Sequence, residues 1–238
     1  LIMIREFVDI SHDVTETADV CIIGSGAGGA AAARELAENG LRVVVLEEGS
    51  RFSIKNFNQD PAEMMGMMYR DAGTTLALGM PPIAITLGKC LGGTTTINSA
   101  TCFRTPEPVI QKWARDYDCA GLTYAELAPW FDRVESDICV TELTEDVLGE
   151  GYQVVKRGAG KLGLPLQPLQ HNVKECQGAG VCQWGCIKGA KQSADVAYIP
   201  RAEAAGAIIY TNCQARKVLA EAGRAVGVRG RFLNPRTG

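Results

Sequence analysis

The stretch that decides the fold covers residues 19–49 and reads DVCIIGSGAGGAAAARELAENGLRVVVLEEG. Residues 20–23 are apolar and have the character of a buried strand, an alanine-rich helical segment follows, and residues 43–46 form a second apolar run. The helix is expected to end at Asn39 and Gly40, because glycine just past the last turn is a typical helix stop. A strand, a helix and a second strand in this order form a βαβ unit, which predicts an α/β fold with a parallel sheet.

A glycine-rich turn joins the first strand to the helix. Gly24, Gly26 and Gly29 form a GxGxxG motif at that point. The first glycine permits a tight turn, the second lets the backbone approach a pyrophosphate, and the third lets the helix pack closely on the strand. Glu47 ends the second strand, where its carboxylate can accept hydrogen bonds from ribose hydroxyls and disfavours a 2′-phosphate. These residues predict a Rossmann-like, doubly wound domain that binds a dinucleotide, and they leave FAD and NAD open.

A second glycine-rich loop follows at residues 88–98, GKCLGGTTTIN. Gly92 and Gly93 expose backbone N–H groups, and Thr94 and Asn98 add side-chain donors. This set suits a pyrophosphate or the edge of a flavin ring. The same letters also fit a plain polar turn that leads into a strand, and that alternative stays open here.

Composition excludes several classes of partner. The chain has 238 residues and a formal net charge of −3, with no extended basic run, so we expect small-molecule partners and no nucleic acid. No apolar stretch is long enough for a transmembrane segment, and the first residues lack the layout of a signal peptide. We therefore expect a soluble, cytoplasmic protein, with export together with a partner as the alternative.

Nine cysteines form two groups. Six occur singly beside apolar or small residues, and we interpret them as packing thiols of a reducing compartment: Cys21, Cys90, Cys102, Cys119, Cys139 and Cys213. The other three, Cys176, Cys182 and Cys186, lie within CQGAGVCQWGC. A disulfide would leave one of them unpaired, and a zinc site needs a fourth ligand for which only His171 is close in sequence. A three-iron cluster, with one cysteine for each iron, and thiols that merely shape the loop both stay open.

The order of these motifs resembles that of the glucose-methanol-choline (GMC) family of flavoprotein oxidoreductases. GSGAGG, LEEG and GKCLGGTTTIN are followed by FRTPEP at residues 103–108 and TYAELAPWFDRVE at 123–135. Residues 185–212 and 223–230 look like that family's return from the substrate region to the FAD domain. The resemblance implies that FAD binds at Gly24, Gly26, Gly29, Glu47, Gly92, Gly93, Thr94, Asn98 and Ala215.

The resemblance also implies an activity. Members of the family oxidise CH–OH groups of an alcohol, polyol or sugar by hydride transfer to flavin N5, and the electrons then pass to oxygen, a quinone or an acceptor protein. The cysteine spacing resembles that of members that carry a 3Fe-4S cluster, which would make Cys176, Cys182 and Cys186 metal ligands. The family's catalytic histidine lies in a C-terminal part that this chain does not include. Neither His12 nor His171 stands in its sequence context, so we assign no catalytic residue and expect this chain alone to be inactive.

Two alternatives from other classes remain. One is a flavin or iron-sulfur electron-transfer module without catalysis of its own. The other is an NAD-dependent dehydrogenase, against which the second glycine loop argues.

The motifs predict three segments. Residues 14–105 form the first part of the FAD-binding domain, in which 51–87 cover the cofactor. Residues 106–186 form a helical, substrate-side excursion that contains the cysteine cluster, and 187–238 return to the FAD-binding domain through a β meander. Within these segments, the methionines of 64–68 are expected on an apolar helix face, and Trp113, Trp130 and Phe131 in the core.

Overall fold

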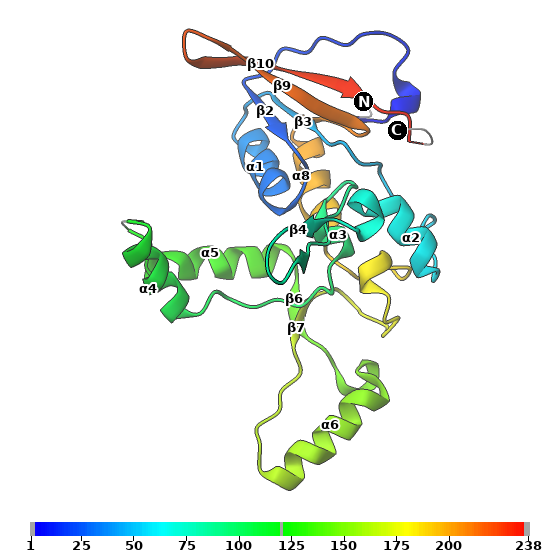
Figure 1. Ribbon diagram of the computed structural model, residues 1–238, viewed down its shortest axis with the longest axis vertical. Coiled ribbons are helices and arrows are strands. Elements are labelled where there is room, and N and C mark those ends of the chain that lie inside the picture. The colour runs from blue at the N-terminus through cyan, green and yellow to red at the C-terminus, as the bar shows by residue number, and fades with distance from the viewer. Residues whose placement is uncertain (1–2, 120, 236–238) are drawn as a thin grey trace. The chain divides into compact units, whose positions relative to one another are not determined.

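The computed structural model describes residues 3–119 and 121–235 (Figure 1). These residues form two compact units. The first unit contains the chain up to Ser99, the segment Ala179–Gly189 and the chain from Ser193 onward. The second contains Ala100–Gly178 and Ala190–Gln192.

The first unit carries the βαβ motif. Its strands are β1 (Ile4–Arg5), β2 (Val20–Ile23), β3 (Val43–Leu46), β4 (Leu76–Ala77), β5 (Ile83–Ala84), β8 (Ile208–Tyr210), β9 (Cys213–Glu221) and β10 (Arg224–Phe232). Its α-helices are α1 (Ala27–Glu38), α2 (Pro61–Met68), α3 (Thr94–Ile97), α7 (Ala194–Ala197) and α8 (Ile199–Ala204), and its 3₁₀ helices are η1 (Phe7–Asp9), η2 (Arg70–Gly73) and η4 (Cys182–Trp184).

Four parallel strands form the central sheet, in the order β1-β8-β3-β2. Strands β2 and β3 pair in register from Val20 with Val43 to Ile23 with Leu46. Helix α1 connects them, as a parallel pair requires. The predicted α/β fold with a parallel sheet is confirmed.

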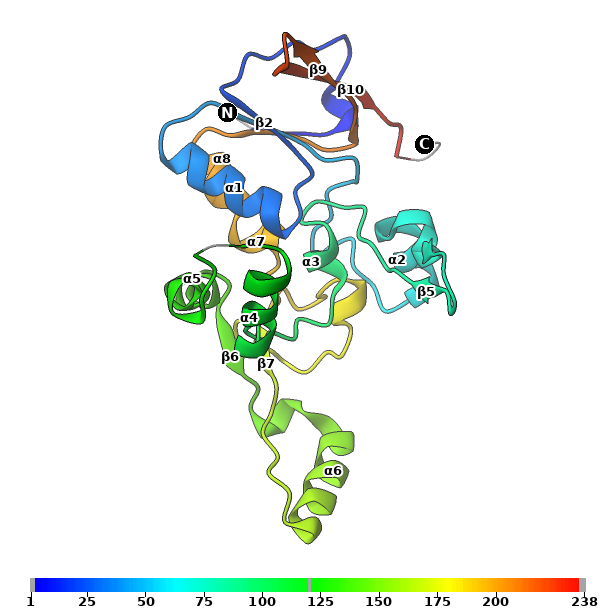
Figure 2. The ribbon, with the colours of Figure 1, turned by 60° about the vertical axis from the view of Figure 1, so that its left-hand side comes forward.

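Different elements cover the two faces of this sheet (Figure 2). Helix α1 packs on β2 and β3 and against α8 through Ala30, Ala33 and Ala37, which are at most 3% exposed. Their small side chains allow this close approach. The antiparallel hairpin of β9 and β10 covers the other face, where Val44 and Leu46 join a buried apolar cluster. The sheet is thus covered on both faces, as its nearly uninterrupted apolar strands require.

A second core cluster surrounds α2. Asp60 caps this helix by accepting hydrogen bonds from the backbone N–H groups of Ala62 and Glu63. Met64 and Met68 are fully buried and Met65 is half-buried, whereas Met67 is 45% exposed. The prediction that these methionines fill an apolar helix face is confirmed for Met64, Met65 and Met68 and is wrong for Met67.

The second unit contains α4 (Glu107–Asp116), α5 (Tyr124–Asp137), β6 (Val140–Glu142), η3 (Glu145–Val147), α6 (Gly149–Leu162) and β7 (Gln170–Asn172). Strands β6 and β7 form an antiparallel pair. Helix α5 begins with a capping box, in which Thr123 and Glu126 bond each other's backbone N–H groups.

The prediction that two tryptophans lie in the core is wrong. Trp113 is 39% exposed and Trp130 is 59% exposed. Ile110 takes the buried position of α4, and no side chain of α5 is fully buried. The Trp130 ring lies at the surface with the guanidinium carbon of Arg133 at 6.0 Å from its centre, so an aromatic side chain here has a favourable partner without burial. Phe131, by contrast, is half-buried.

In the part of the chain that the structure describes, we find no helix with the length and apolar character needed to cross a bilayer.

Candidate functional site

A cavity of about 290 Å³ opens at the carboxyl ends of β2 and β3. This is the edge of a parallel α/β sheet at which ligands generally bind. The residues that line it come from both glycine loops, from the end of β3, from η2 and from β9: Ile23, Gly24, Gly26, Leu46, Glu47, Glu48, Arg70, Gly88, Gly93, Thr94 and Ala215. Six of these were predicted as cofactor-binding residues: Gly24, Gly26, Glu47, Gly93, Thr94 and Ala215.

Three predicted residues do not line this cavity. Gly29 lies below the loop, where an added Cβ would come within 2.0 Å of the Gly24 carbonyl oxygen. Gly92 is buried with φ +85°, and an added Cβ would lie 2.4 Å from Thr96 Oγ1. Both glycines therefore allow close packing of the loops. Asn98 follows α3 and is exposed outside the cavity.

The start of α1 is suited to an anion. Gly26 is its N-cap residue and provides no side-chain hydrogen bond, and the first turn contains no acidic residue. A Cβ at Gly26 would meet no atom within 4 Å, so the space in front of the backbone is open. Backbone N–H groups at such a helix start attract a phosphate by hydrogen bonding and by the helix dipole. Gly93 lies against this point, since its added Cβ would be 3.0 Å from Gly26 Cα.

Ser25 ties three segments together, and sequence reasoning missed it. It is completely buried, and its hydroxyl donates to Glu47 Oε2 at 2.6 Å while accepting from the Gly92 backbone N–H at 3.0 Å. Its own backbone N–H also donates to Glu47 Oε2, at 2.9 Å. Ser25 occupies a variable position of GxGxxG, so the motif did not mark it. The contact of its hydroxyl with Glu47 is visible only in the structure.

Glu47 is 5% exposed and well satisfied. Besides the two bonds from Ser25, its Oε1 accepts from the Gly49 backbone N–H at 2.8 Å. A carboxylate has about four acceptor positions, so one remains for a ligand hydroxyl. The predicted ribose-binding residue therefore lies in the cavity with capacity for a further hydrogen bond.

A second acidic residue, Glu48, also lines the cavity together with Arg70. An Arg70 guanidinium nitrogen lies 2.6 Å from Glu48 Oε1, and Gln214 donates to Glu48 Oε2 at 3.1 Å. Sequence reasoning missed Arg70 because it lies in the segment 51–87, where no motif marked it.

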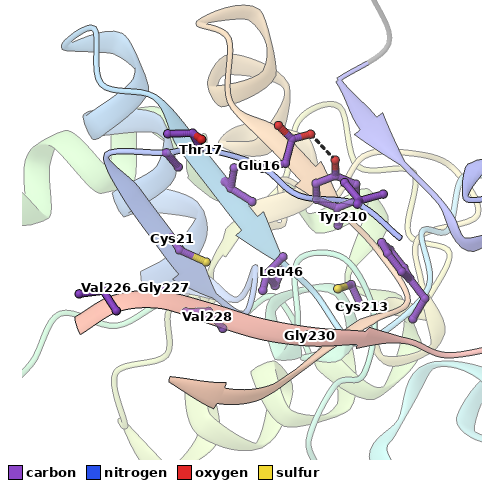
Figure 3. Close-up of a pocket in the computed structure, with 14 residues that line it drawn as sticks. Glu16, Thr17, Cys21, Leu46, Tyr210, Cys213, Val226, Gly227, Val228 and Gly230 are labelled. Carbon is purple, nitrogen blue, oxygen red and sulfur yellow. Dashed lines mark hydrogen bonds between the residues drawn. The ribbon is translucent and has the colours of Figure 1, made fainter. Parts of the chain in front are cut away.

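Another cavity, of about 340 Å³, lies between the sheet and the hairpin of β9 and β10 (Figure 3). In this view Cys21 and Cys213 lie on either side of Leu46. Burial raises the pKa of the Cys213 thiol to about 11. Burial, followed by a hydrogen bond to Glu16 at 2.5 Å, raises the pKa of the Tyr210 hydroxyl to about 12. Both groups therefore stay protonated at neutral pH. The cavity is lined by apolar side chains together with the polar side chains of Glu16, Thr17 and Tyr210.

The three clustered cysteines are divided between the units. Cys176 belongs to the second unit, whereas Cys182 and Cys186 belong to the first. All three are half-buried and outside any disulfide. Among residues 3–119 and 121–235, no group of three or more Cys, His, Asp or Glu side chains is arranged to hold a metal ion. The iron-sulfur cluster at these three cysteines stays a prediction.

The two histidines belong to different units. His12 is exposed beside Ser11 in the first unit, with 3.1 Å between Nδ1 and the serine hydroxyl. His171 lies in β7 of the second unit, with Nδ1 3.0 Å from the Leu169 carbonyl oxygen. Neither lines the cavity, and we assign neither a catalytic role.

Comparison with protein families gives two matches. Residues 65–237 match the N-terminal domain of the GMC oxidoreductases. Residues 19–56, which include the first glycine loop and Glu47, match the FAD dependent oxidoreductases.

Similar proteins agree with these matches. The chain is 37% identical to an uncharacterised GMC-type oxidoreductase of Mycobacterium tuberculosis, over 90% of this chain and 34% of that protein. It is 30% identical to a long-chain-alcohol oxidase of Arabidopsis thaliana, over 90% of this chain and 29% of that protein. The chain therefore spans about a third of the length of these relatives.

A solved structure shows the same fold. Pyridoxine 4-oxidase from Mesorbium loti superposes with a TM-score of 0.64 at 18% sequence identity, over 91% of this chain and 48% of that one.

Proposed function

Because this chain belongs to the GMC oxidoreductase family, we propose that it forms the FAD-binding part of an enzyme that oxidises CH–OH groups. One observation carries the proposal: a single cavity gathers both glycine loops, the acidic residue that ends β3, and Ala215.

The residues present fit FAD. The diphosphate is held at the start of α1, where Gly26 leaves open space before uncapped backbone N–H groups. Gly93 and Thr94 provide the facing wall. Glu47 accepts a hydrogen bond from a ribose hydroxyl, and its charge disfavours a 2′-phosphate at that position. These contacts bind and orient the nucleotide half of the cofactor.

Bound FAD supplies the hydride acceptor for oxidation of the donor. The role of this chain is to bind and orient that cofactor, and none of its residues is assigned as the base. The long-chain-alcohol oxidase relative makes a long-chain alcohol the first donor to test, with polyols and sugars next. The donor is tested on an enzyme that combines this chain with the family's catalytic C-terminal part, because this chain alone is expected to be inactive. Anaerobic mixing should bleach the flavin absorbance of that enzyme with the alcohol, and a response only to sugars would exclude the alcohol assignment.

Ligand titration tests the cofactor. The purified, flavin-free protein should bind FAD well ahead of NAD in isothermal titration calorimetry. Gly26→Val should abolish FAD binding, because the valine side chain would project into the space assigned to the diphosphate. The variant should still fold, since a Cβ at this position meets no protein atom within 4 Å. Gly66→Val is the matched control, since a Cβ at Gly66 also meets nothing within 4 Å and Gly66 lies outside the nucleotide cavity. Preference for NAD would refute the assignment.

The cysteine cluster is a second element of the proposal. We expect Cys176, Cys182 and Cys186 to ligate an iron-sulfur centre that accepts electrons from reduced flavin. Anaerobically purified protein should contain about three irons per chain and give a paramagnetic resonance signal when oxidised. Cys182→Ser should remove the signal, and Cys139→Ser, outside the cluster, should retain it. Iron-free protein with three alkylatable thiols would leave these cysteines a loop-shaping role.

A further inference from the structure

The nucleotide cavity has an unusual balance of charge. Two carboxylates, those of Glu47 and Glu48, line it, and among its described lining residues Arg70 carries the single positive charge. A diphosphate would add further negative charge to this space. Like charges a few ångströms apart repel strongly at reduced dielectric, so a cation beside the anion would stabilise it further than the backbone N–H groups of α1 alone.

The two carboxylates differ in how they are compensated. Glu47 receives three hydrogen bonds from Ser25 and Gly49 and needs no cation. Glu48 instead faces the Arg70 guanidinium at 2.6 Å. A guanidinium has five N–H donors, so pairing with one carboxylate oxygen leaves donors for a second anion.

The backbone fixes Arg70 beside the second glycine loop. Its N–H donates to the Leu87 carbonyl oxygen at 2.8 Å, and the Lys89 N–H donates back to the Met68 carbonyl oxygen at 2.7 Å. Asp71 and Ala72, which follow, both adopt positive φ angles. Non-glycine residues hold this conformation only where surrounding structure determines it. The backbone hydrogen bonds thus fix where the Arg70 side chain starts, and Glu48 fixes the position of its guanidinium.

We propose that Arg70 binds the diphosphate of the cofactor, and that Glu48 is a positioning residue that holds its guanidinium in place. This inference rests on the proposed FAD site. It assigns a diphosphate-binding residue to the segment 51–87, outside both glycine loops. The contact explains why a cation lies among residues that otherwise offer only backbone donors, hydroxyls and acids.

The test separates the diphosphate from the nucleoside. Flavin-free protein is titrated with FAD, ADP and adenosine, the last of which lacks phosphate. Arg70→Gln should lower the affinities for FAD and for ADP in parallel by about tenfold or more, since the lost contact is a charge-assisted hydrogen bond. Adenosine should bind unchanged, which also shows that the cavity is still formed.

Two further variants complete the design. Lys89→Gln is the matched control, because Lys89 lines a neighbouring cavity and not this one, and it should leave all three affinities unchanged. If Arg70→Gln unfolds because Glu48 is left unpaired, the double variant Glu48→Gln, Arg70→Gln replaces it, with the same expected loss for ADP.

The possible failures are distinguishable. A wild-type protein that does not bind FAD refutes the proposed function and this inference together. A wild-type protein that binds FAD, with ADP affinity unchanged in the Arg70 variants, overturns this inference alone. Equal losses in the Lys89 and Arg70 variants also overturn it, because the effect would then be one of general charge.

Discussion

Gly29 and Ser25 show how much depends on single atoms around the nucleotide cavity. The absence of a side chain at Gly29 allows α1 to lie directly on the Gly24 carbonyl. The hydroxyl of Ser25 connects the first loop to Glu47 and to the second loop. Both residues shape the site, and of the two only Ser25 bonds directly to a cavity-lining side chain.

Gly29→Ala should destabilise the fold by about 3 kcal/mol or more, because backbone atoms that cannot rotate away would overlap the new methyl group. The neighbouring Gly28→Ala is the control: a Cβ there meets nothing within 4 Å, so its stability should stay within about 1 kcal/mol of wild type. Urea unfolding of the flavin-free protein measures both. Equal stability of the two variants would contradict the packing role of Gly29.

Ser25→Ala should lower the free energy of unfolding by about 1–3 kcal/mol, since it removes a donor to a buried carboxylate and an acceptor for the Gly92 N–H. Ser53→Ala provides the comparison, because its hydroxyl bonds Asn56 at an exposed site. Its effect should be under about 0.5 kcal/mol. Similar losses in both variants would mean that the buried network adds little.

Helix α2 illustrates packing of a whole element. Met64 and Met68 of this helix are fully buried and Met65 is half-buried against them, whereas Met67 is exposed. The buried pair packs with Tyr69 and Cys90 in one cluster, and Cys90 belongs to the second glycine loop. Helix α2 therefore packs against the second glycine loop through Cys90.

Met64→Ala should cost about 2–5 kcal/mol, because the cavity left in this cluster cannot close completely. Met67→Ala makes the same chemical change at an exposed position and should cost about 0.5 kcal/mol or less. Chemical denaturation followed by fluorescence gives both values. A small effect at Met64 would show that the cluster relaxes around the missing side chain.

The sequence predicted helices and strands well where neighbouring residues alone determine them. The strand-loop-helix-strand motif was predicted to the residue for both strands, since apolar runs and glycine turns act locally. The exposed Trp113 and Trp130 were not predictable in this way, because periodicity gives the apolar face of a helix and not what lies opposite it. Arg70 and Ser25 were missed for the same reason: their roles come from contacts between distant segments.

Across the whole molecule, burial of protonated groups predicts a sensitivity to alkali. The pKa of Cys213 is raised from 9.0 to about 11 and that of Tyr210 from 10.0 to about 12, mainly by burial. Unfolding lets both ionise at their ordinary pKa values. Their contribution to stability is therefore complete below about pH 9 and is lost as pH rises through 11 to 12.

The urea midpoint should thus fall between pH 9 and pH 12. Tyr210→Phe should make this fall shallower, because the variant has no hydroxyl to ionise on unfolding. Tyr117→Phe, at a position that is 71% exposed, should leave the slope as in the wild type. Identical slopes in all three proteins would exclude Tyr210 as a source of the alkaline loss.

The strand order β1-β8-β3-β2 has a consequence for synthesis on the ribosome. Strand β8 lies between β1 and β3, yet it is made more than a hundred residues after β3. At ordinary translation speeds this interval is on the order of ten seconds, during which β2 and β3 can pair but β1 has no neighbour. The nascent sheet therefore exposes an unfilled edge of β3 to other chains. A chaperone that covers this edge until β8 is made would protect the chain in that period.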